Sequence, residues 1–423
     1  MSWRRFLYSL AFYLLQPLLW LHLLWRGRKN PAYYRRWSER AGFVDAPENP
    51  AVPVICLHAV SVGETMAARP LIEQLLAELP DYQLWITSTT PTGSDTVQRL
   101  FGQRVAHSYL PYDTPGAVQR FLKRVQPKIL LIMETEVWPN LFAACARKKI
   151  PLLLLNARLS SRSLQRYQKV QGLVAETLQK TAVIMARTEQ DAEHFRLLGA
   201  GPAAVRVSGD IKFDVSAADE VRLKGQHLRE RWGKRPVWCA GSTHEGEDEL
   251  ILSAHLSLRT VFPDLLLILV PRHPERFEAV AGLCRERGIS LVRRSNAGQV
   301  GPDTAVLLGD SMGELQLWYA ASDIAFVGGS LVKVGGHNPL EAVAFAVPVV
   351  SGRYIHNFAD MYPVLLACGA AELVDSCADL TDHLRYWLSD NVARQTAGQA
   401  GRRLLDEHRG VTNGLLTVIR NYL

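Results

Sequence analysis

The stretch VPVICLHAVSVGETMAARPLIEQLLAEL, residues 52–79, decides the fold class because it joins two different structural signals. Its first half is an apolar run, which predicts a buried strand. Its second half carries apolar residues at helical spacing and predicts a helix that reaches about Leu79. A loop of small residues connects the two halves, and the acid Glu64 stands at the mouth of the helix. This order predicts the first strand and helix of a parallel sheet.

The same alternation recurs along the chain in two series. The first continues with strands expected at 82–89, 128–134, 150–158 and 181–188, and the second has strands expected at 236–243, 265–273, 324–330 and 347–352. A charged helical stretch at about 215–235 separates the two series. We therefore predict two doubly wound, Rossmann-like α/β domains, residues 30–214 and 215–423, with a ligand cleft between facing strand ends. An apolar segment, residues 1–29, precedes them.

The composition excludes some classes of protein and leaves others open. The chain has 423 residues, of which 48% are hydrophobic and 21% charged, so long disordered stretches are not expected. A net charge of +7 suits an anionic partner, but it does not choose among nucleic acid, acidic lipid and a phosphorylated substrate. The six cysteines form no C-x-x-C pair and indicate free thiols in a reducing compartment. The histidines show no metal-binding spacing, so no metal site is expected.

The N-terminal segment predicts attachment to a membrane. Residues 6–25 carry no formal charge and are long enough to span a bilayer, with aromatic residues near both ends. More basic residues follow this run than precede it, which predicts that the main body stays on the cytoplasmic side. The sequence leaves open whether the helix spans the bilayer, lies flat in its interface or packs on the body.

In the first half, acids rather than phosphate-binding residues follow the apolar strands. There is no G-x-G-x-x-G and no Walker lysine, and an acid such as Glu64 would repel a phosphate. Glu64 can be a general base at a strand end, or it can simply complement the dipole of its helix.

Two further strand ends in this half carry candidate site residues. Glu134 and Glu136 follow the strand at 128–134, and at least one of them is expected in a cleft, because acids beside an apolar strand must be paired or hydrated. Lys212, in the stretch VSGDIKFD, can stabilise developing negative charge or pair with a neighbouring acid.

In the second half, basic and glycine-rich strand ends suggest an anion site. Arg272 and His273 close one strand, and an arginine there can clamp a phosphate. Met312 and Gly313 are expected at the start of a helix, with Glu314 just inside it. The stretch GGSLVKVGGHNPLE ends in Asn338, Pro339, Leu340 and Glu341, which read as a complete helix cap with a capping box. The same helix start could also bind an anion, and Glu341 could accept hydrogen bonds from a ribose.

Taken together, these features resemble a GT-B glycosyltransferase. The segments HAVSVGE, LPYD, METEVWPN, EQDAEHFRLLGA, GDIKFD, VPRHPERF, MGEL and GGSLVKVGGHNPLE are similar to those of the lipopolysaccharide 3-deoxy-D-manno-octulosonic acid (Kdo) transferase family. The resemblance runs from the N-terminal segment to about residue 360. The family's usual HSVSVGE reads HAVSVGE here, with Ala59 in place of a serine, and this departure spares Glu64.

The resemblance implies an inverting transfer of Kdo from CMP-Kdo to the lipid A precursor, lipid IVA, on the cytoplasmic face of the bacterial inner membrane. It implies that the first domain binds the acceptor and the second binds CMP-Kdo, with no metal, no other cofactor and no nucleic acid. Glu64 would be the proton acceptor, and Glu134 and Lys212 would stabilise the transition state. CMP contacts map onto Arg272, His273, Met312, Gly313, Glu314, Asn338, Pro339, Leu340 and Glu341. The alternative is a sugar-nucleotide epimerase of the same two-domain build, and the number of Kdo residues added stays open.

Overall fold

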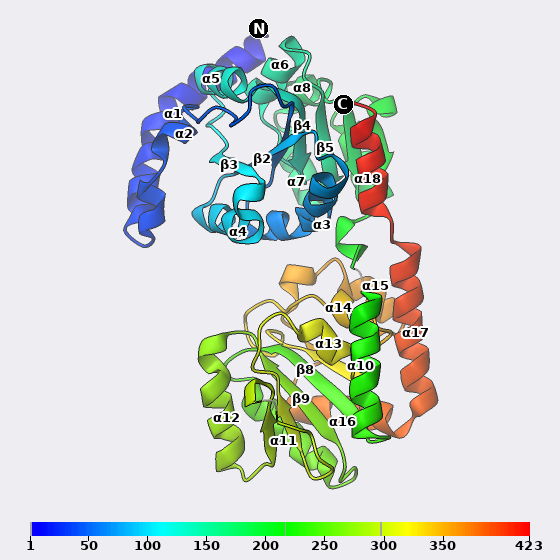
Figure 1. Cartoon of the computed structure of the whole chain (residues 1–423). Coiled ribbons are helices and arrows are strands. Elements are labelled where there is room, and N and C mark those ends of the chain that lie inside the picture. The colour runs from blue at the N-terminus through cyan, green and yellow to red at the C-terminus, as the bar shows by residue number, and fades with distance from the viewer. Residues whose placement is uncertain (1, 216, 297) are drawn as a thin grey trace. The chain divides into compact units, whose positions relative to one another are not determined.

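The computed structural model describes residues 2–215, 217–296 and 298–423 and divides into two compact units. Unit 1 comprises the chain up to Asp214 together with Gly410–Leu423, and unit 2 comprises Val215–Arg409. Each unit is a parallel sheet with helices packed against it (Figure 1). This confirms the prediction of two doubly wound α/β domains.

The sheet of unit 1 has seven parallel strands in the order β3-β2-β1-β4-β5-β6-β7. Its central strands are buried over almost their whole length, as their apolar sequences predict. The strands are β1 (Val54–His58), β2 (Gln83–Ser88), β3 (Ala106–Tyr109), β4 (Pro127–Met133), β5 (Leu152–Ala157), β6 (Val183–Ala186) and β7 (Val205–Val207).

Helices cover this sheet on both faces and enclose two apolar cores. They are α1 (Trp3–Gly27), α2 (Trp37–Arg40), α3 (Val62–Glu78), α4 (Pro91–Phe101), α5 (Pro115–Val125), α6 (Pro139–Arg147), α7 (Ser161–Gln168), α8 (Gln171–Leu178), α9 (Glu189–Leu197) and α18 (Val411–Arg420). The helices α7 and α8 follow each other directly along the chain. The two helices are separated at Lys169 and Val170, and Val170 is exposed with a non-helical backbone.

The end of the chain returns to unit 1, which differs from the predicted domain range of 215–423. Val411, Leu415, Leu416 and Ile419 of α18 are buried in the same core as Leu57 of β1. Asp214 holds the start of this segment, because its carboxylate accepts hydrogen bonds from the backbone N–H groups of Gly410 and Thr412. The apolar face of α18 therefore completes the first unit rather than the second.

The sheet of unit 2 also has seven parallel strands, in the order β10-β11-β9-β8-β12-β13-β14. The strands are β8 (Val237–Thr243), β9 (Leu266–Pro271), β10 (Leu291–Arg293), β11 (Val306–Leu308), β12 (Ile324–Val327), β13 (Val349–Gly352) and β14 (Ala371–Val374). The helices are α10 (Asp219–Trp232), α11 (Asp248–Arg259), α12 (Phe277–Glu286), α13 (Leu315–Ala320), α14 (Leu340–Val343), α15 (Tyr362–Ala367), α16 (Cys377–Ser389) and α17 (Asn391–Glu407).

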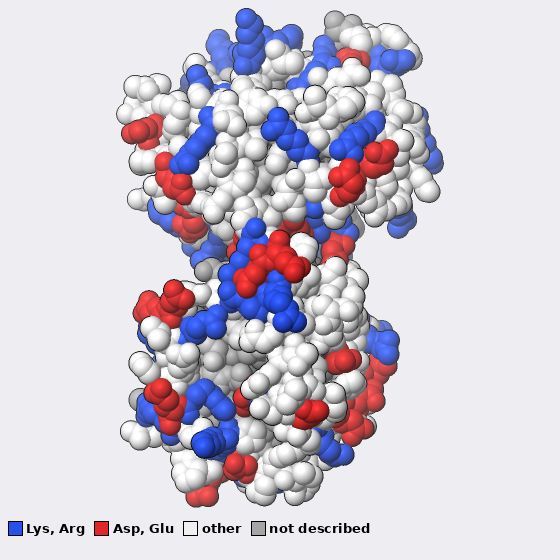
Figure 2. Space-filling view, turned by 90° about the vertical axis from the view of Figure 1, so that its right-hand side faces the viewer, with Lys and Arg blue, Asp and Glu red and all other residues white. Residues whose placement is uncertain are grey.

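The charged stretch predicted as a connection forms α10, a surface helix of unit 2. It packs on α13, where Gly225 is buried against Ala320. The Lys224 ammonium pairs with Glu220 one turn away, in an exposed ion pair. Figure 2 shows the face that carries α10 and α17, on which basic and acidic side chains are interspersed. The net positive charge is thus not gathered into one patch on this face.

The topology places the candidate residues at equivalent points of the two sheets. In a doubly wound sheet, ligands bind beyond the carboxyl ends of the strands where the strand order reverses. In unit 1 this point lies between β1 and β4, and the loops that follow these strands carry Glu64 and Glu134. In unit 2 it lies between β8 and β12, followed by His244 and the glycines 328 and 329.

Candidate active site

Glu64 is the third residue of α3 and stands directly beyond β1. Its Oε2 accepts a hydrogen bond of 2.7 Å from the backbone N–H of Val60, which fixes the carboxylate against the loop that leads into the helix. Burial raises the pKa of Glu64 to about 8, the Val60 hydrogen bond opposes this, and repulsion from Glu134 and Glu136 adds to it. A carboxyl group with this pKa can accept a proton near neutral pH.

Glu134 and Glu136 lie close enough to Glu64 to influence its charge, so the structure brings these three acids together. Glu134 has a φ of 55°, which is rare for a residue with a side chain, and its backbone N–H bonds to the Leu155 carbonyl at 2.9 Å. Strained backbone of this kind concentrates at functional sites. The pKa of Glu136 is raised to about 7 by burial and by repulsion from Glu134.

Lys212 lies half-buried in a short 3-10 turn, Ile211–Phe213, that follows β7. This turn packs against α3, the helix that carries Glu64, and Ile211 belongs to the same apolar core. The preceding Asp210 fixes the turn: its Oδ1 accepts the Lys212 backbone N–H at 3.1 Å, and its Oδ2 pairs with the buried Arg187 at 2.5 Å. The neighbouring acid is therefore committed to Arg187.

In unit 2 the glycine-rich loop after β12 is occupied by an internal anion. Glu247 is fully buried, and its carboxylate accepts backbone hydrogen bonds from Gly329 (2.7 Å), Ser330 (3.0 Å) and Leu331 (2.9 Å). It also accepts the N–H of His244 at 2.9 Å. The amides of residues 329–331 are therefore satisfied within the protein, and the loop acts here as a fixed support.

Three histidines and an arginine gather beside this loop. The Nε2 atoms of His244 and His337 lie 2.9 Å apart with the rings nearly parallel, and the His273 ring lies edge-on to His244 at 5.3 Å. Gly329, at φ 69°, leaves room for both rings, because a Cβ there would lie 3.2–3.3 Å from them. Burial, together with the charges of His244, Arg272 and His273, lowers the pKa of His337 to about 4.

Glu341 lies near Arg272, and the Met312–Glu314 segment has other partners. Burial raises the pKa of Glu341 to about 7, and the positive charge of Arg272 opposes this. Gly313 adopts a φ of 85°, so α13 begins only at Leu315, and the Glu314 carboxylate bonds to Arg294 (2.8 Å and 3.1 Å) and to Ser311. Glu314 was predicted inside the helix and instead precedes it.

The predicted capping box at Asn338–Glu341 forms only in part. The Asn338 side chain accepts the N–H of Leu340 at 3.1 Å, which is a capping contact. The helix that follows has only four residues and begins at Leu340, so Glu341 lies too early in it to occupy the predicted third position. Among the described hydrogen bonds, none joins the Glu341 side chain to the Asn338 backbone.

The predicted N-terminal anchor is the helix α1, and unit 1 holds one side of it. Among the described residues it is the one helix long and apolar enough to cross a membrane. Ser9 donates to Asn140 at 3.1 Å, and the buried Asp113, which caps the start of α6, accepts from the Tyr8 hydroxyl. The ring of Trp20 contacts the rings of Trp37 and Tyr112. The opposite side is exposed and apolar, with Phe6, Leu7, Leu10, Leu14, Leu18, Leu21 and Trp25.

Three residues of the unit 2 site, His244, Glu247 and His337, were not predicted as site candidates from the sequence. His244 and Glu247 stand in GSTHEGE, 241–247, which follows the first strand of its domain as HAVSVGE does in the other half. That parallel was a usable signal. His337 stands in the glycine-rich stretch, but nothing in the sequence indicates its contact with His244, 93 positions away. Among the described residues, no group of three or more His, Cys, Asp or Glu side chains is placed to hold a metal ion.

Comparison with known proteins identifies the family. A family model described as 3-deoxy-D-manno-octulosonic-acid transferase (kdotransferase) matches residues 35–215. A 3-deoxy-D-manno-octulosonic acid transferase of Haemophilus influenzae is 42% identical over 421 residues, 99% of each chain. The chain belongs to the Kdo transferase family. A second Kdo transferase, from Bordetella pertussis, is 38% identical over 433 residues, again 99% of each chain.

One solved structure shares the fold of this Kdo transferase family member, and the likeness extends to the fold alone. It is described as a putative UDP-N-acetylglucosamine 2-epimerase from Listeria monocytogenes. It matches with a TM-score of 0.52 and 15% identity, covering 87% of this chain and 96% of its own. At this identity the epimerase alternative rests on the shared architecture alone.

Proposed function

We propose that this protein transfers Kdo from CMP-Kdo to a hydroxyl group of lipid IVA, with inversion at the anomeric carbon. The observation that carries the proposal is the group of three acids beyond β1 and β4, in which Glu64 has a pKa of about 8. Glu64 takes the proton of the acceptor hydroxyl, the oxygen attacks the anomeric carbon, and the bond from that carbon to the phosphate of CMP breaks. CMP leaves with the bonding electron pair, so its departure requires no acid.

We assign the donor to unit 2 because its basic groups suit a phosphate. Arg272 and His273 follow β9, and His244 and His337 stand beside them. An arginine near these histidines provides hydrogen-bond donors and one firm positive charge for the leaving phosphate. Glu341, close to Arg272, is proposed to accept hydrogen bonds from the ribose hydroxyls. Met312, Gly313, Asn338, Pro339 and Leu340 are proposed contacts of the nucleotide on the family resemblance.

Glu134 and Lys212 are proposed to stabilise the transition state in unit 1. Glu134 is held in a strained conformation beside Glu64, and the turn of Lys212 packs against the helix of Glu64. A lysine can balance negative charge that develops on the reacting groups, and a fixed acid can balance positive charge that develops on the sugar.

We propose that α1 lies flat in the membrane interface on the cytoplasmic side of the inner membrane. A spanning helix would have to leave Asp113, Asn140, Trp37 and Tyr112, which hold one of its sides. The other side offers a continuous row of apolar residues to lipid. Arg4 and Arg5 precede this row, and Arg26, Arg28 and Lys29 follow it, which suits anionic lipid head groups.

The test uses the full-length protein in detergent with CMP-Kdo and lipid IVA. Mass spectrometry should show Kdo added to the lipid and should give the number of residues added. Glu64→Gln should lower the rate by about two to four powers of ten, since it removes only the base. Glu73→Gln, an exposed acid of the same helix that pairs with Arg104, should leave the rate unchanged. No transfer by the wild type, with interconversion of UDP-sugars instead, would establish the epimerase alternative.

A further inference from the structure

Arg40, the last residue of α2, is a buried cation without a carboxylate partner among the residues that the structure describes. Only 4% of the residue is exposed. Its guanidinium makes one hydrogen bond, from NH2 to the Thr89 carbonyl at 2.9 Å, and lies 4.1 Å above the Tyr109 ring. The Nε atom is buried with no hydrogen-bond partner in the described structure. A buried charge left in this state is costly, and a ligand is one way to compensate for it.

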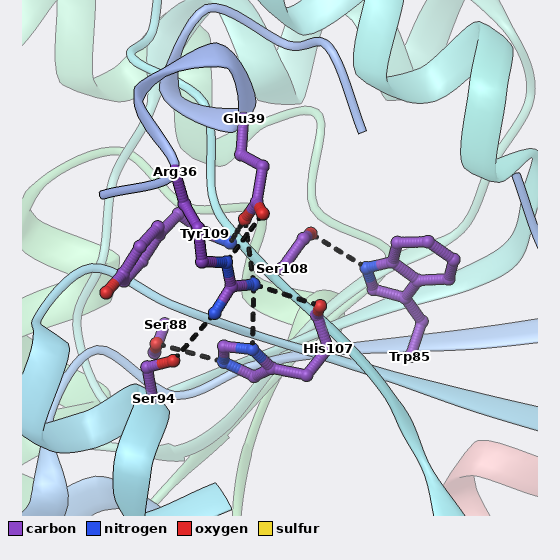
Figure 3. Close-up of polar contacts among 8 residues, drawn as sticks. All are labelled: Arg36, Glu39, Trp85, Ser88, Ser94, His107, Ser108 and Tyr109. Carbon is purple, nitrogen blue, oxygen red and sulfur yellow. Dashed lines mark hydrogen bonds and ion pairs between the residues drawn. The ribbon is translucent and has the colours of Figure 1, made fainter. Parts of the chain in front are cut away.

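The nearest acid is already committed to another arginine. Glu39 accepts two hydrogen bonds from Arg36, at 2.6 Å and 2.9 Å, and a third from the Tyr109 backbone at 2.8 Å. Figure 3 shows the Arg36 guanidinium between Glu39, Ser94 and His107. Arg36 and Arg40 both lie over the Tyr109 ring, but of these two arginines the Glu39 carboxylate bonds to Arg36 alone in the described structure. Asp95 of α4 is exposed and lies close enough to act on Tyr109, but no described ion pair joins it to Arg40, which therefore has no direct acidic partner.

The carbonyl that Arg40 bonds to belongs to Thr89, which leads directly into the start of α4. Thr89 and Thr90 are partly exposed, and Thr90 is the N-cap of the eleven-residue helix α4. The start of a helix carries partial positive charge and unpaired N–H groups. The Thr89 and Thr90 hydroxyls donate to the Val60 carbonyl, and the Thr90 Oγ1 atom also accepts the Gly93 N–H, so the helix start and the desolvated arginine are the groups that suit a phosphate here.

A continuous chain of hydrogen bonds joins Arg40 to the proposed base. Arg40 donates to the Thr89 carbonyl, and the Thr89 backbone N–H donates to the Val60 carbonyl at 3.1 Å. The Val60 N–H in turn donates to Glu64. On its other side Arg40 influences Tyr112, whose ring contacts Phe12 and Trp20 of α1. Arg40 thus stands between the apolar helix and the loop of Glu64.

We propose that Arg40, with Thr89, Thr90 and the start of α4, binds a phosphate group of the amphiphilic acceptor. This rests on the proposed function, because it takes a phosphorylated glycolipid as acceptor. If the acyl chains of the acceptor lie beside α1 and its reacting hydroxyl lies at Glu64, the polar head group of the lipid lies near Arg40. The site fixes which hydroxyl of the head group reaches the base.

The test compares Arg40→Gln and Arg40→Lys with the wild type in full-length protein, in detergent without phospholipid. Arg40→Gln should raise the KM for bis-phosphorylated lipid IVA at least about tenfold, with the KM for CMP-Kdo unchanged. Arg40→Lys should have a smaller effect, since it keeps the charge but loses the planar fork. Arg120→Gln is the matched control: Arg120 also bonds to a backbone carbonyl and stacks on a ring, that of Phe43, but it is exposed.

The second arm changes the acceptor instead of the protein. With one of the two monophosphorylated forms of lipid IVA, the KM of the wild type should rise by the same factor. For that acceptor the KM of Arg40→Gln should equal the KM of the wild type. The wild-type comparison of acceptors remains a test even if the Arg40 variants fold poorly. Their melting temperatures will show whether they do. Equal KM values of the wild type for all three acceptors would overturn the inference.

Two further outcomes separate the inference from its neighbours. Absence of any transfer by the wild type would count against the proposed function itself. Loss of binding to phosphatidylglycerol vesicles by Arg40→Gln, with an unchanged KM for lipid IVA in detergent, would overturn the acceptor site and assign Arg40 to membrane head groups instead.

Discussion

The imidazoles of His244 and His337 are joined by a 2.9 Å contact between their Nε2 atoms, beside Arg272 and His273. Two neutral rings can make this contact only when one nitrogen carries a proton and the other accepts it. The pKa of both rings is lowered, first by burial, and that of His337 lies at about 4. The pair is therefore uncharged at neutral pH and can gain a proton when an anion binds.

Donor binding should strengthen as the pH falls, because a bound phosphate favours the protonated histidine pair. The probe is cytidine 5′-methyl phosphate, whose single charge does not titrate in this range. Its affinity should increase by about tenfold from about pH 8 to about pH 5.5, measured by calorimetric titration. His337→Gln should flatten this dependence, whereas Glu341→Gln should keep it. If Glu341→Gln removes the pH dependence of the affinity, the group that takes up the proton on binding is Glu341.

Glu64 should make the protein less stable as the pH rises. The pKa of Glu64 is about 8 in the folded protein and 4.5 in the unfolded chain. The stability that protonated Glu64 contributes is therefore fully present below about pH 4.5 and is lost as the pH rises to about 8. Glu64→Gln, which cannot ionise, should therefore melt at a higher temperature than the wild type at alkaline pH. The difference should shrink toward pH 4.5. Parallel melting curves across this range would contradict the raised pKa.

Glu341→Gln should weaken CMP binding about tenfold and leave the melting temperature nearly unchanged. A carboxylate accepts stronger hydrogen bonds from ribose hydroxyls than an amide does. The structure strengthens this forecast, because Glu341 does not complete the predicted capping box. Titration with CMP and thermal melting decide between the two roles. Unchanged affinity together with lowered stability would make Glu341 a purely structural residue.

Glu247→Gln should destabilise unit 2 by about 2–4 kcal/mol, measured by denaturant unfolding. The carboxylate accepts four backbone N–H groups, and an amide would turn donor hydrogens toward some of them. Glu245→Gln is the control, since Glu245 is exposed in the same loop. A loss of CMP affinity with stability intact would instead make Glu247 a ligand-binding acid.

Most of the strands could be predicted from the sequence, because parallel strands buried on both faces are apolar throughout. Their order within each sheet was not predicted, and neither was β14. Glu64 and Glu134 were recognisable for the same reason, since an acid directly after such a strand is conspicuous. The role of Glu247 could not be predicted, although its motif was visible, because its four partners include residues 329–331, more than eighty positions away. The return of α18 was also hidden, since an amphipathic helix does not state which core it covers.

Local signals also misled where tertiary contacts decide. The sequence of residues 338–341 fits a capping box, but the helix there has one turn and begins a residue late. Glycines 328 and 329 resemble an anion-binding turn, and the anion turned out to be the protein's own Glu247. In both cases the residue types were read correctly, and the partner came from another element.

The return of residues 410–423 to unit 1 affects the order in which the protein can be made. Unit 1 is built from two segments, and the whole of unit 2, residues 215–409, separates them in the chain. During synthesis the ribosome therefore releases every strand of the first sheet long before Val411, Leu415 and Ile419 become available to cover its core. Until then the part of the core that α18 covers stays exposed beside α3, and exposed apolar surface of this kind makes a growing chain prone to aggregation.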